Sequence, residues 1–325
     1  MLRSKRVRAK GDDLPNAKKP KASTVNQKSI VNYLTQARTP LDTMQNKKEN
    51  DAAEHTSATS TSETGKKRSE QIIPNYVSDK LLSIEKQLSA KVQDITFPSS
   101  IPYIYNPLEY AFETHAMYVR KYCTGTKKIL FLGMNPGPWG MSQTGVPFGE
   151  ISMVRDWLEI SGAVGHPPKE HPERIVTGFQ CPRSEVSGFR LWGLFRQYCG
   201  KTENFFRHAY MHNYCPLAFM DGSARNITPA ELKGEAQEIL HKACDKSLID
   251  ISRLLNIEII VGIGRYAEKR AQIAVQTGKL KIKVVCLRHP SPRVVGNQNW
   301  NVIAMQQLSE SGLLKYFEKA KDSTV

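Results

Sequence analysis

From about residue 78 onward the chain alternates between apolar runs and amphipathic segments. Two amphipathic segments come first, one after the Ser/Asp pair at 78–79 and one after Asn106, a residue type that often caps helices. Four nearly continuous apolar runs, typical of buried strands, fall at 128–134, 208–214, 257–264 and 281–289. Further helical patterns fall near 150–161, 189–199, 229–255, 265–277 and 301–320. This alternation predicts an α/β fold with a parallel sheet covered by helices on both faces.

The first part of the chain has a different composition. Residues 1–68 contain 15 Lys and Arg, 7 Asp and Glu, and almost no aromatic residues, and the polar run ENDAAEHTSATSTSETGKKRSE begins at Glu49. Such a segment cannot bury enough apolar surface to offset the entropy of ordering it. We therefore expect residues 1–77 to form a disordered basic arm and residues 78–325 to form one folded domain.

Positive charge is present in both parts of the chain. The formal net charge is +15, of which +8 falls in residues 1–68 and +7 in the remainder. This charge favours a polyanionic partner for both parts. Charge alone is equally consistent with surface lysines that only keep the protein in solution.

Several classes of protein are disfavoured by what the sequence lacks. No window approaches the roughly 20 apolar residues that span a bilayer, and the start MLRSKRVRAK has no apolar signal region, so we expect an intracellular protein without a membrane partner. The six cysteines show no CxxC or Cys/His pair, so neither a zinc site nor a four-thiolate cluster is indicated, and reduced, mostly buried thiols are expected. They are Cys123, Cys181, Cys199, Cys215, Cys244 and Cys286.

Two kinds of short motif occur in the arm. Basic clusters at 5–8 and 18–21 resemble nuclear-import signals, although short basic runs are also common in solvated tails. The segment QKSIVNYL resembles the motif that inserts one helical turn into the replication sliding clamp, but Leu stands where a second aromatic residue is expected. The clamp motif would consist of Gln27, Ile30, Tyr33 and Leu34. Chance matches of this length remain an alternative.

Unusual polar residues follow three of the four predicted strands. Asn135 follows the first strand in GMNPG, Asn213 follows the second in HNYCP, and His289 follows the fourth in HPSPR. Sheets of this class place their ligands at the carboxyl ends of the strands, so these side chains are candidates for one site. The third strand ends in GIG, which we interpret as structural only.

The loop GMNPGPWGMSQTGVPFGE, which begins at Gly133, has features of a rigid and uncharged pocket. A phosphate-binding loop is disfavoured because Pro136 and Pro138 remove two backbone donors and because the glycine spacing does not fit. Prolines fix the backbone, glycines allow close approach, and Phe148 offers an aromatic face for a flat ligand. Asn135 could then hold a water molecule without adding charge, or could simply cap a turn.

Asn213 and His289 suit the recognition and release of a pyrimidine. A buried amide presents one donor beside one acceptor, which matches the O4 acceptor and N3–H donor of uracil and mismatches cytosine. Sites built this way discriminate by roughly ten-thousand-fold in good cases. A neutral imidazole that donates a hydrogen bond to O2 would stabilise the negative charge on a departing base.

Four sequence blocks together resemble one family, the single-strand-selective monofunctional branch of the uracil-DNA glycosylase superfamily. The blocks are GMNPGPWGMSQTGVPFGE, CPRSEVSGFRLWG, HNYCPL and HPSPR, and the resemblance covers roughly residues 78–320. It implies a three-layer α/β/α sandwich with a short, mainly parallel central sheet. It also implies a flipped-out base whose N-glycosidic bond is hydrolysed without a metal or cofactor.

The resemblance also implies a role for each site residue. Asn135 would hold the attacking water, Phe148 would stack on uracil, Asn213 would read its edge, and His289 would stabilise the leaving base. Met134, Gly137 and Met141 would form the wall near C5, which in this family tolerates substituents such as that of 5-hydroxymethyluracil.

Two absences bear on the reaction that the family implies. Asn135 stands where the best-known uracil glycosylases have Asp, so no carboxylate base is present and slower turnover is expected. No lysine nucleophile occurs in these loops, which argues against strand cleavage.

Contacts to DNA are expected from two further segments. The stretch that begins at His289 resembles the family's wedge, which enters the gap left by a flipped base in single- or double-stranded DNA. The wedge residues would be Pro292, Arg293 and Val294. Ser184, Ser187 and Gly188 would contact backbone phosphates, although the same segment could be an ordinary polar turn. We expect a nuclear monomer that acts in base excision repair. The alternatives are a mismatch-specific thymine/uracil glycosylase of the same superfamily and a catalytically silent DNA-binding relative.

Overall fold

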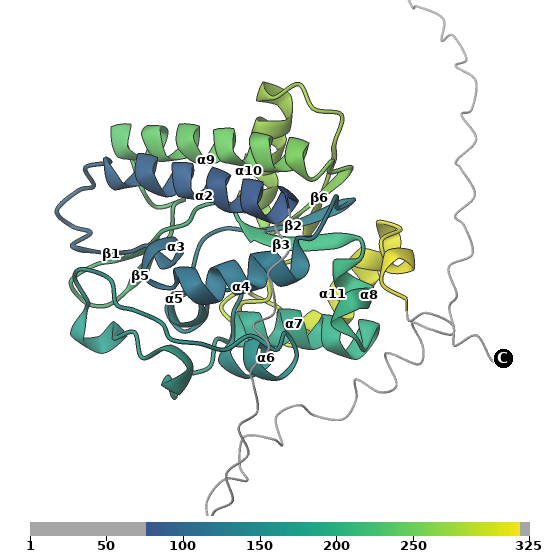
Figure 1. Cartoon of the computed structure of the whole chain (residues 1–325), viewed down its shortest axis with the longest axis horizontal. Helices are drawn as coiled ribbons and strands as arrows, with labels where there is room; N and C mark the ends of the chain where they lie inside the picture. Colours follow the sequence, from purple (N-terminus) through teal and green to yellow (C-terminus); the bar gives the residue numbers. More distant parts are fainter. Residues whose placement is uncertain (1–75, 319–325) are drawn as a thin grey trace, which may run out of the picture. The chain divides into compact units, whose positions relative to one another are not determined.

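The computed structural model describes residues 76–318 (Figure 1). Its centre is a four-stranded parallel sheet in the order β3-β2-β6-β7. The strands are β2 (Ile129–Gly133), β3 (Ala209–Asn213), β6 (Ile259–Ile263) and β7 (Lys283–Leu287). Each strand lies within one of the four apolar runs, which confirms those four predictions.

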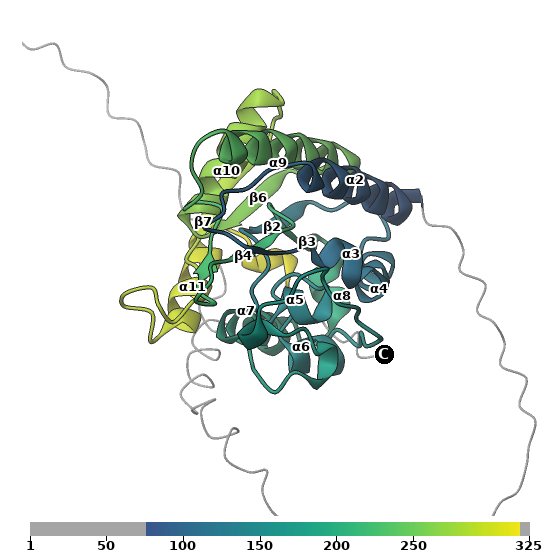
Figure 2. The same cartoon turned by 90° about the vertical axis from the view of Figure 1, so that its left-hand side faces the viewer.

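Helices cover both faces of this sheet. One layer contains α2 (Tyr76–Gln93), α9 (Glu235–Leu254) and α10 (Arg265–Thr277). The other contains α4 (Phe112–Tyr122), α7 (Val186–Cys199), α8 (Thr202–Phe206) and α11 (Trp300–Glu310). Both views show the sheet between the two layers, which confirms the expected three-layer sandwich (Figures 1 and 2).

Short elements connect the main ones, and a second sheet accompanies the first. The connecting helices are α3 (Pro107–Tyr110), α5 (Met141–Thr144) and α6 (Ile151–Asp156), with single 3-10 turns at Pro172–Arg174, Gly178–Gln180 and Leu314–Tyr316. The second sheet is antiparallel in the order β1-β4-β5, with strands Tyr103–Tyr105, Ala218–Met220 and Asn226–Ile227. Strands of two or three residues have no periodicity to detect, so the sequence did not predict this sheet.

The structure corrects the expected cap at Asn106. The Asn106 side chain makes no capping hydrogen bond, and its Nδ2 donates instead to Ser89 Oγ at 2.6 Å. The single helix predicted after it is divided into α3 and α4 at Ala111, whose φ of −107° and ψ of 25° interrupt the helical path. A side-chain contact to α2 has therefore replaced the local cap that the sequence suggested.

Buried aromatic rings fill the space between the sheet and the α7–α8 layer. Phe131 of β2 lies 5.1 Å from Phe195 of α7 and 5.5 Å from Phe205 of α8, measured between ring centroids. Large aromatic side chains contribute much of the burial energy of a core. This packing holds β2 in place against α7 and α8, and so helps to position the loop that follows β2.

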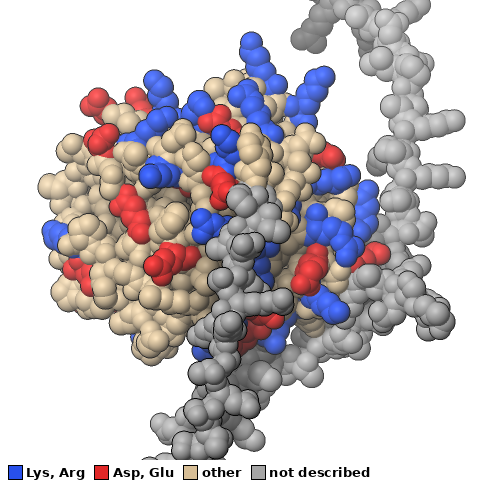
Figure 3. All heavy atoms as spheres, viewed as in Figure 1, with Lys and Arg blue, Asp and Glu red and all other residues tan. Residues whose placement is uncertain are grey.

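The surface has a mixed charge pattern within the described part of the chain. Lys and Arg gather over the α9–α10 layer in Figure 3, with acidic side chains among them. Among the helices of residues 76–318, none combines the length and the apolar character of a membrane span.

Candidate active site

The predicted site is built where β2 and β3 end side by side. Gly133 pairs in register with Asn213, and the chain continues with backbone bonds from Tyr214 N to Gly133 O and from Cys215 N to Met134 O, both 2.9 Å. A Cβ on Gly133 would overlap Asn213 Oδ1 and the ring of Phe148. The glycine therefore makes room for two predicted ligand-binding side chains at the same point.

Phe148 is held in a backbone conformation that aromatic residues rarely adopt. Its φ is +52°, in the left-handed region, and its side chain is almost buried, with a relative exposure of 7%. A bulky residue keeps such a conformation only when its surroundings enforce it. Gly188 supplies part of that constraint, because a Cβ there would overlap the Phe148 carbonyl. The Phe148 ring lies 6.2 Å from the His289 ring, centroid to centroid.

Asn213 has one satisfied polar atom and one unsatisfied polar atom. Its residue exposure is 5%, and its Nδ2 donates to Met141 Sδ at 3.2 Å. Its Oδ1 is buried and has no hydrogen-bond partner among the described residues. A buried acceptor without a donor is costly and calls for an explanation, and a ligand N–H is the simplest one.

His289 is held as a neutral ring with a defined tautomer. Ser291 N donates to His289 Nδ1 at 3.1 Å, which requires a lone pair on Nδ1 and places the proton of the neutral ring on Nε2. Burial lowers the pKa of His289 to about 4, so the ring is uncharged at neutral pH. No residue of the described chain accepts a hydrogen bond from Nε2, which is left as a donor.

The end of the third strand packs beside His289. Gly264 follows β6 with a φ of +88°, and a Cβ there would lie 3.2 Å from the Cβ of His289. The role of Gly264 is one of packing beside His289, which is consistent with a structural interpretation of GIG. Gly264 allows the imidazole to pack directly against the end of β6.

Asn135 has its amide group oriented by backbone carbonyls. Its Nδ2 donates to Leu217 O at 3.1 Å and, at 3.4 Å, to Pro136 O. Both bonds use the amino group, so Oδ1 remains the free acceptor. That arrangement suits a water molecule whose proton points toward Oδ1.

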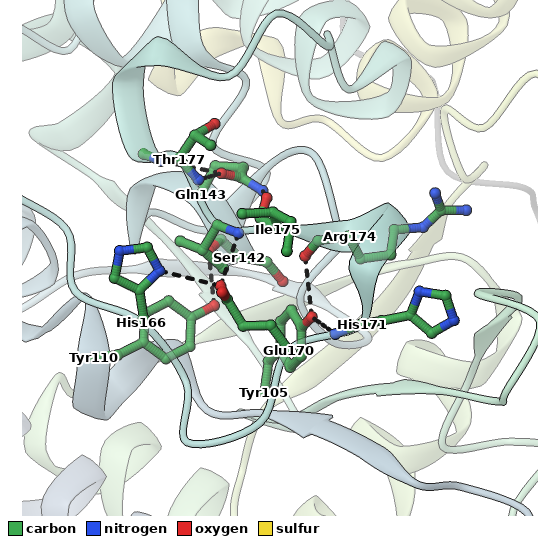
Figure 4. Close-up of polar contacts among 12 residues, drawn as sticks. Tyr105, Tyr110, Ser142, Gln143, His166, Glu170, His171, Arg174, Ile175 and Thr177 are labelled. Carbon is green, nitrogen blue, oxygen red and sulfur yellow. Dashed lines mark hydrogen bonds and ion pairs between the residues drawn. The ribbon is translucent and has the colours of Figure 1, made fainter.

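Gln143 stiffens the loop that contains Asn135. Its Nε2 donates to Pro138 O and to Ile175 O, each at 3.1 Å, and its Oε1 accepts from Thr177 N at 2.9 Å and from Gly178 N at 3.1 Å (Figure 4). Every hydrogen-bonding group of this side chain is used. No sequence pattern connected Gln143 with residues more than 30 positions away, so its role became visible only in the structure.

Glu185 is a second residue that the sequence analysis missed. A Cβ on Gly137 or Gly140 would overlap its carboxyl group, so this group lies directly against the Asn135 loop. Its Oε2 is buried without a partner among residues 76–318. Burial and then the charge of Glu150 raise the pKa of Glu185 to about 7. Glu185 directly precedes α7, but its side chain makes no capping bond.

The remaining predicted residues lie in the Asn135 loop, in α5 and at the start of α7. Met134 and Gly137 are half-buried in the Asn135 loop, and Met141 is 2% exposed beside Asn213. Ser184 is exposed and donates to Glu150 Oε1 at 3.0 Å, whereas Ser187 is half-buried. Gly188 is buried, and its packing against Phe148 accounts for the glycine without a phosphate contact.

The predicted wedge is an exposed loop with a rigid base. Asn297 Nδ2 donates to His289 O at 2.9 Å and to Ser291 O at 2.7 Å, which closes the loop. Pro292 and Arg293 are exposed and Val294 is half-buried. Val295 is 90% exposed, so an apolar side chain that the sequence analysis did not select stands at the tip.

The cysteines agree with the sequence prediction of reduced, mostly buried thiols. All six cysteines are free, and five of them are buried. Within residues 76–318 no group of three His, Cys, Asp or Glu side chains is placed to hold a metal ion.

A cavity of about 420 Å³ between α2, α3 and α4 is lined by residues such as Leu82, Ser89 and Phe112, and includes none of the predicted site residues.

Comparison with known proteins identifies the family. The model of the uracil DNA glycosylase superfamily matches residues 120–310, which include every site loop described above. The chain belongs to this superfamily. It is 49% identical to the single-strand selective monofunctional uracil DNA glycosylases of Bos taurus, over 74% of this chain and 89% of that protein, and of Mus musculus, over 73% and 86%. The resemblance inferred from the four sequence blocks is thereby confirmed.

A solved structure supports the fold independently. Wild-type SMUG2 of Pedobacter heparinus is similar with a TM-score of 0.50 and 21% sequence identity, over 72% of this chain and 98% of that one. At this level of identity the likeness concerns the fold alone. This likeness agrees with the α/β architecture of the chain.

Proposed function

We propose that this protein is a monofunctional DNA glycosylase that flips uracil out of DNA and hydrolyses its N-glycosidic bond, leaving an abasic site. The observation that supports this most directly is the buried, unpartnered Oδ1 of Asn213 beside the ring of Phe148. An aromatic face and a lone acceptor at its edge suit a flat, neutral ring with an N–H group. The relatives at 49% identity are named for the same activity.

Recognition would use both polar atoms of the Asn213 amide. Oδ1 would accept from uracil N3–H, and Nδ2 would leave Met141 Sδ, a weak acceptor, to donate to O4. Cytosine would place its N3 acceptor against Oδ1 and its amino group against Nδ2. Two unpaired buried groups would then oppose binding of cytosine.

Hydrolysis would use Asn135 and His289 on either side of the glycosidic bond. Asn135 Oδ1 would hold a water molecule for attack on C1′ of the sugar, while the bonding electrons leave with the base. The Nε2–H of neutral His289 would donate to O2 and stabilise the resulting anion. The loops offer no lysine amine to form a covalent sugar intermediate, so the strand would stay intact.

The wall near C5 supports activity on oxidised uracils. Met141 and Met134 are flexible thioethers, and Gly137 adds no side chain. Met141 would lose its contact with Asn213 Nδ2 once this group turns to the base. A hydroxymethyl group at C5 would fit by displacement of this side chain, so 5-hydroxymethyluracil is included in the proposal.

DNA contacts would come from the wedge loop and the start of α7. Pro292, Arg293, Val294 and the exposed Val295 would fill the gap left by the flipped base, and Ser184 and Ser187 would contact phosphates. Single-stranded and duplex DNA would both be substrates, the single strand at a lower cost of base extrusion. The protein would act as a monomer.

The arm would supply nuclear import and a clamp contact. These motifs lie outside the described residues, so they remain proposals from the sequence alone. A peptide of residues 25–38 should bind the sliding clamp in a titration, and its failure to bind would remove the clamp proposal only. Fusion of residues 1–24 to a fluorescent protein should direct it to the nucleus.

Incubation with a uracil-containing oligonucleotide, followed by hot alkali, tests the central proposal. Cleavage should require alkali, because the enzyme itself leaves the backbone intact. Absence of an alkali-labile site would favour a silent DNA-binding relative. Efficient cleavage at G:T pairs with little activity on single strands would favour the mismatch-specific alternative.

Replacement of Asn135 by Ala separates chemistry from binding. The variant should lose roughly 100-fold or more in the single-turnover rate constant, because the water is no longer held, while its DNA affinity stays near that of the original chain. Rate constants and anisotropy titrations on the same oligonucleotide give both quantities. An equal loss of both would contradict the role given to Asn135.

A further inference from the structure

Trp139 differs from the other three tryptophans of the chain. Those three are buried, and each indole N–H donates to a backbone carbonyl; they are Trp157, Trp192 and Trp300. Trp139 is half-buried, and no described residue accepts a hydrogen bond from its Nε1. It is also the only one of the four located in the Asn135 loop.

Two guanidinium groups lie against the Trp139 ring. Arg174 Cζ is 4.9 Å and Arg183 Cζ is 5.2 Å from the ring centroid, within the range of cation–π contacts. The two arginines come from a segment that Gln143 joins to the Asn135 loop through Ile175 and Thr177. The hydrogen bonds of Gln143 therefore hold the cluster of Trp139, Arg174 and Arg183 in a defined position beside the Asn135 loop.

Neither arginine is neutralised by a carboxylate of the described chain. The guanidinium of Arg183, an exposed residue, makes no hydrogen bond within residues 76–318, and Arg174 Nε is buried without a partner there. The Arg174 guanidinium points away from the Tyr105 and Gln143 contacts (Figure 4). By contrast, Arg225 and Arg270 both pair with acidic side chains. Apart from the hydrogen bond that Arg174 Nη1 donates to the carbonyl of Glu173 at 2.9 Å, the two guanidinium groups are held by the Trp139 ring, and their charges remain available to an anion.

The cluster and the wedge both border the N-terminal end of α7. The carboxyl group of Glu185 lies against Gly137 and Gly140, which places Arg183 beside the Trp139 loop. Farther along the same helix, Arg190 Nη1 donates to Pro290 O at 3.1 Å and to Asn297 O at 3.3 Å in the wedge loop. A DNA strand with its base in the pocket would thus meet the wedge and this cluster along one helix end.

We propose that Trp139, Arg174 and Arg183 form a subsite for unpaired DNA that flanks the flipped uridine. The inference rests on the proposed function and extends it to the strand preference. Trp139 stacks on a neighbouring base, which displaces the guanidinium of the exposed Arg183, and the two arginines bind adjoining phosphates. Charged grooves with aromatic stacking partners are the usual basis of single-strand binding.

The subsite gives a physical reason for favouring single strands. A base in a duplex is already stacked and paired, so it can reach Trp139 only at the cost of breaking those contacts. Phosphate contacts are available in both forms of DNA. Trp139 should therefore affect single strands selectively, whereas the arginines should affect both forms.

Binding of uracil-free DNA tests the subsite without using the reaction. Trp139→Ala should weaken binding of a fluorescein-labelled 15-nucleotide single strand roughly 5- to 150-fold, as expected for one lost base–aromatic stack, and should change duplex binding less than about threefold. Trp139→Phe should keep most of the affinity but abolish the tryptophan-fluorescence quenching that stacking causes. Unchanged single-strand affinity in Trp139→Ala would overturn the proposal, as would an equal loss on duplex.

Arg183→Gln gives a second readout at an exposed residue, where folding is not at risk. It should weaken both forms of DNA and reduce the salt dependence of single-strand binding by about 0.7 in log–log slope, the value for one phosphate contact. Arg253→Gln, on the exposed surface of α9, is the matched control and should leave the slope unchanged. An unaltered slope in Arg183→Gln would remove the arginine from the subsite. Loss of uracil excision in the unsubstituted chain would instead refute the proposed function.

Discussion

In the proposed function, selection of the base depends on the amide of Asn213, whose Oδ1 is buried without a partner among residues 76–318. Asn213→Asp replaces the Nδ2 donor by an oxygen, which cannot donate to uracil O4 when the carboxyl is ionised. When the carboxyl is protonated, the oxygen in the place of Oδ1 can donate to cytosine N3 while the oxygen in the place of Nδ2 accepts from the cytosine amino group. Burial favours the protonated form. The ratio of excision rates for uracil over cytosine should fall by about 100-fold or more, since polar complementarity supplies discrimination of this size.

Rates on matched uracil and cytosine oligonucleotides measure this ratio. Asn213→Ala is the informative control, because it removes donor and acceptor together and should reduce uracil excision without any gain on cytosine. A ratio that Asn213→Asp leaves intact would show that another group reads the base edge.

Glu185 should make the stability of the protein depend on pH. Its pKa is about 4.5 in an unfolded chain and about 7 in the folded one, where burial and then Glu150 disfavour the charge. Between these two values the folded state holds a proton that the unfolded state has lost, so stability falls as the pH rises from about 4.5 to 7 and is constant above. Glu185→Gln is neutral throughout and should avoid this loss.

Urea unfolding at two pH values tests that expectation. Glu185→Gln should match the original chain near pH 5 and exceed it by about 1–3 kcal/mol at pH 8. Glu258→Gln, at an exposed side chain, should show no such difference between the two conditions. A stability gain of equal size at both pH values would mean that packing, not the charge of Glu185, is responsible.

At the level of elements, a buried ionic network joins α2 to the site loops. Glu85 of α2 contacts His115 Nε2 of α4 at 2.8 Å and His212 Nδ1 of β3 at 3.5 Å. His115 Nδ1 lies 2.8 Å from the carbonyl of Gly145, within the loop between Asn135 and Phe148. The network therefore links three elements beneath the base pocket.

The Glu85–His115 pair should stabilise the fold most between about pH 4.5 and 6.5. Burial alone would raise the pKa of Glu85 and lower that of His115. The attraction between the two charges outweighs burial, so the pKa of Glu85 lies below its usual 4.5 and the pKa of His115 lies above its usual 6.5. The contribution of Glu85 is lost as the pH falls below 4.5, and that of His115 as the pH rises above 6.5. Burial lowers the pKa of His212 and so disfavours the charged form of that ring.

Glu85→Gln leaves His115 buried without its counter-ion. The free energy of unfolding should fall by about 3 kcal/mol near pH 6 and by less as the pH rises above 6.5, because the raised pKa of His115 makes its contribution decline in that direction. Chemical denaturation near pH 6 and at higher pH measures the difference. Asp79→Asn on the same helix, at a half-exposed side chain 4.0 Å from Arg120, is the control and should have little effect.

Strands β2, β3 and β6 were predictable because nearly all of their residues are buried, which leaves continuous apolar runs in the sequence. The edge strand β7 is only partly buried but is still rich in apolar residues. The rule that parallel strands end at one edge brought Asn213 and His289 to the same place as Phe148. The roles of Gln143 and Glu185 were not predicted, because the residues they contact lie in segments far along the chain and no local sequence pattern indicates these contacts. Close packing also explained Gly264 and Gly188 only after the backbone paths were known.

At the scale of the whole molecule, all the groups assigned to recognition and hydrolysis lie between Met134 and His289. The matched family region, residues 120–310, is also separate from the basic residues 1–68. Residues 1–68 carry +8 of the net charge, and we expect them to contribute this charge rather than a group that contacts the base. Their effect should be electrostatic and should depend on salt and on the length of the DNA.

Deletion of residues 1–70 should therefore leave single-turnover excision from a 10-nucleotide uracil substrate within about twofold of the full chain, because the base pocket is unchanged. Association with long DNA should weaken at low salt and converge with that of the full chain as salt screens the phosphates. Anisotropy titrations across a salt series, run beside the excision assay, measure both effects. A large loss of excision on the short substrate would place part of the arm in the active site and contradict the assignment of catalysis to the domain alone.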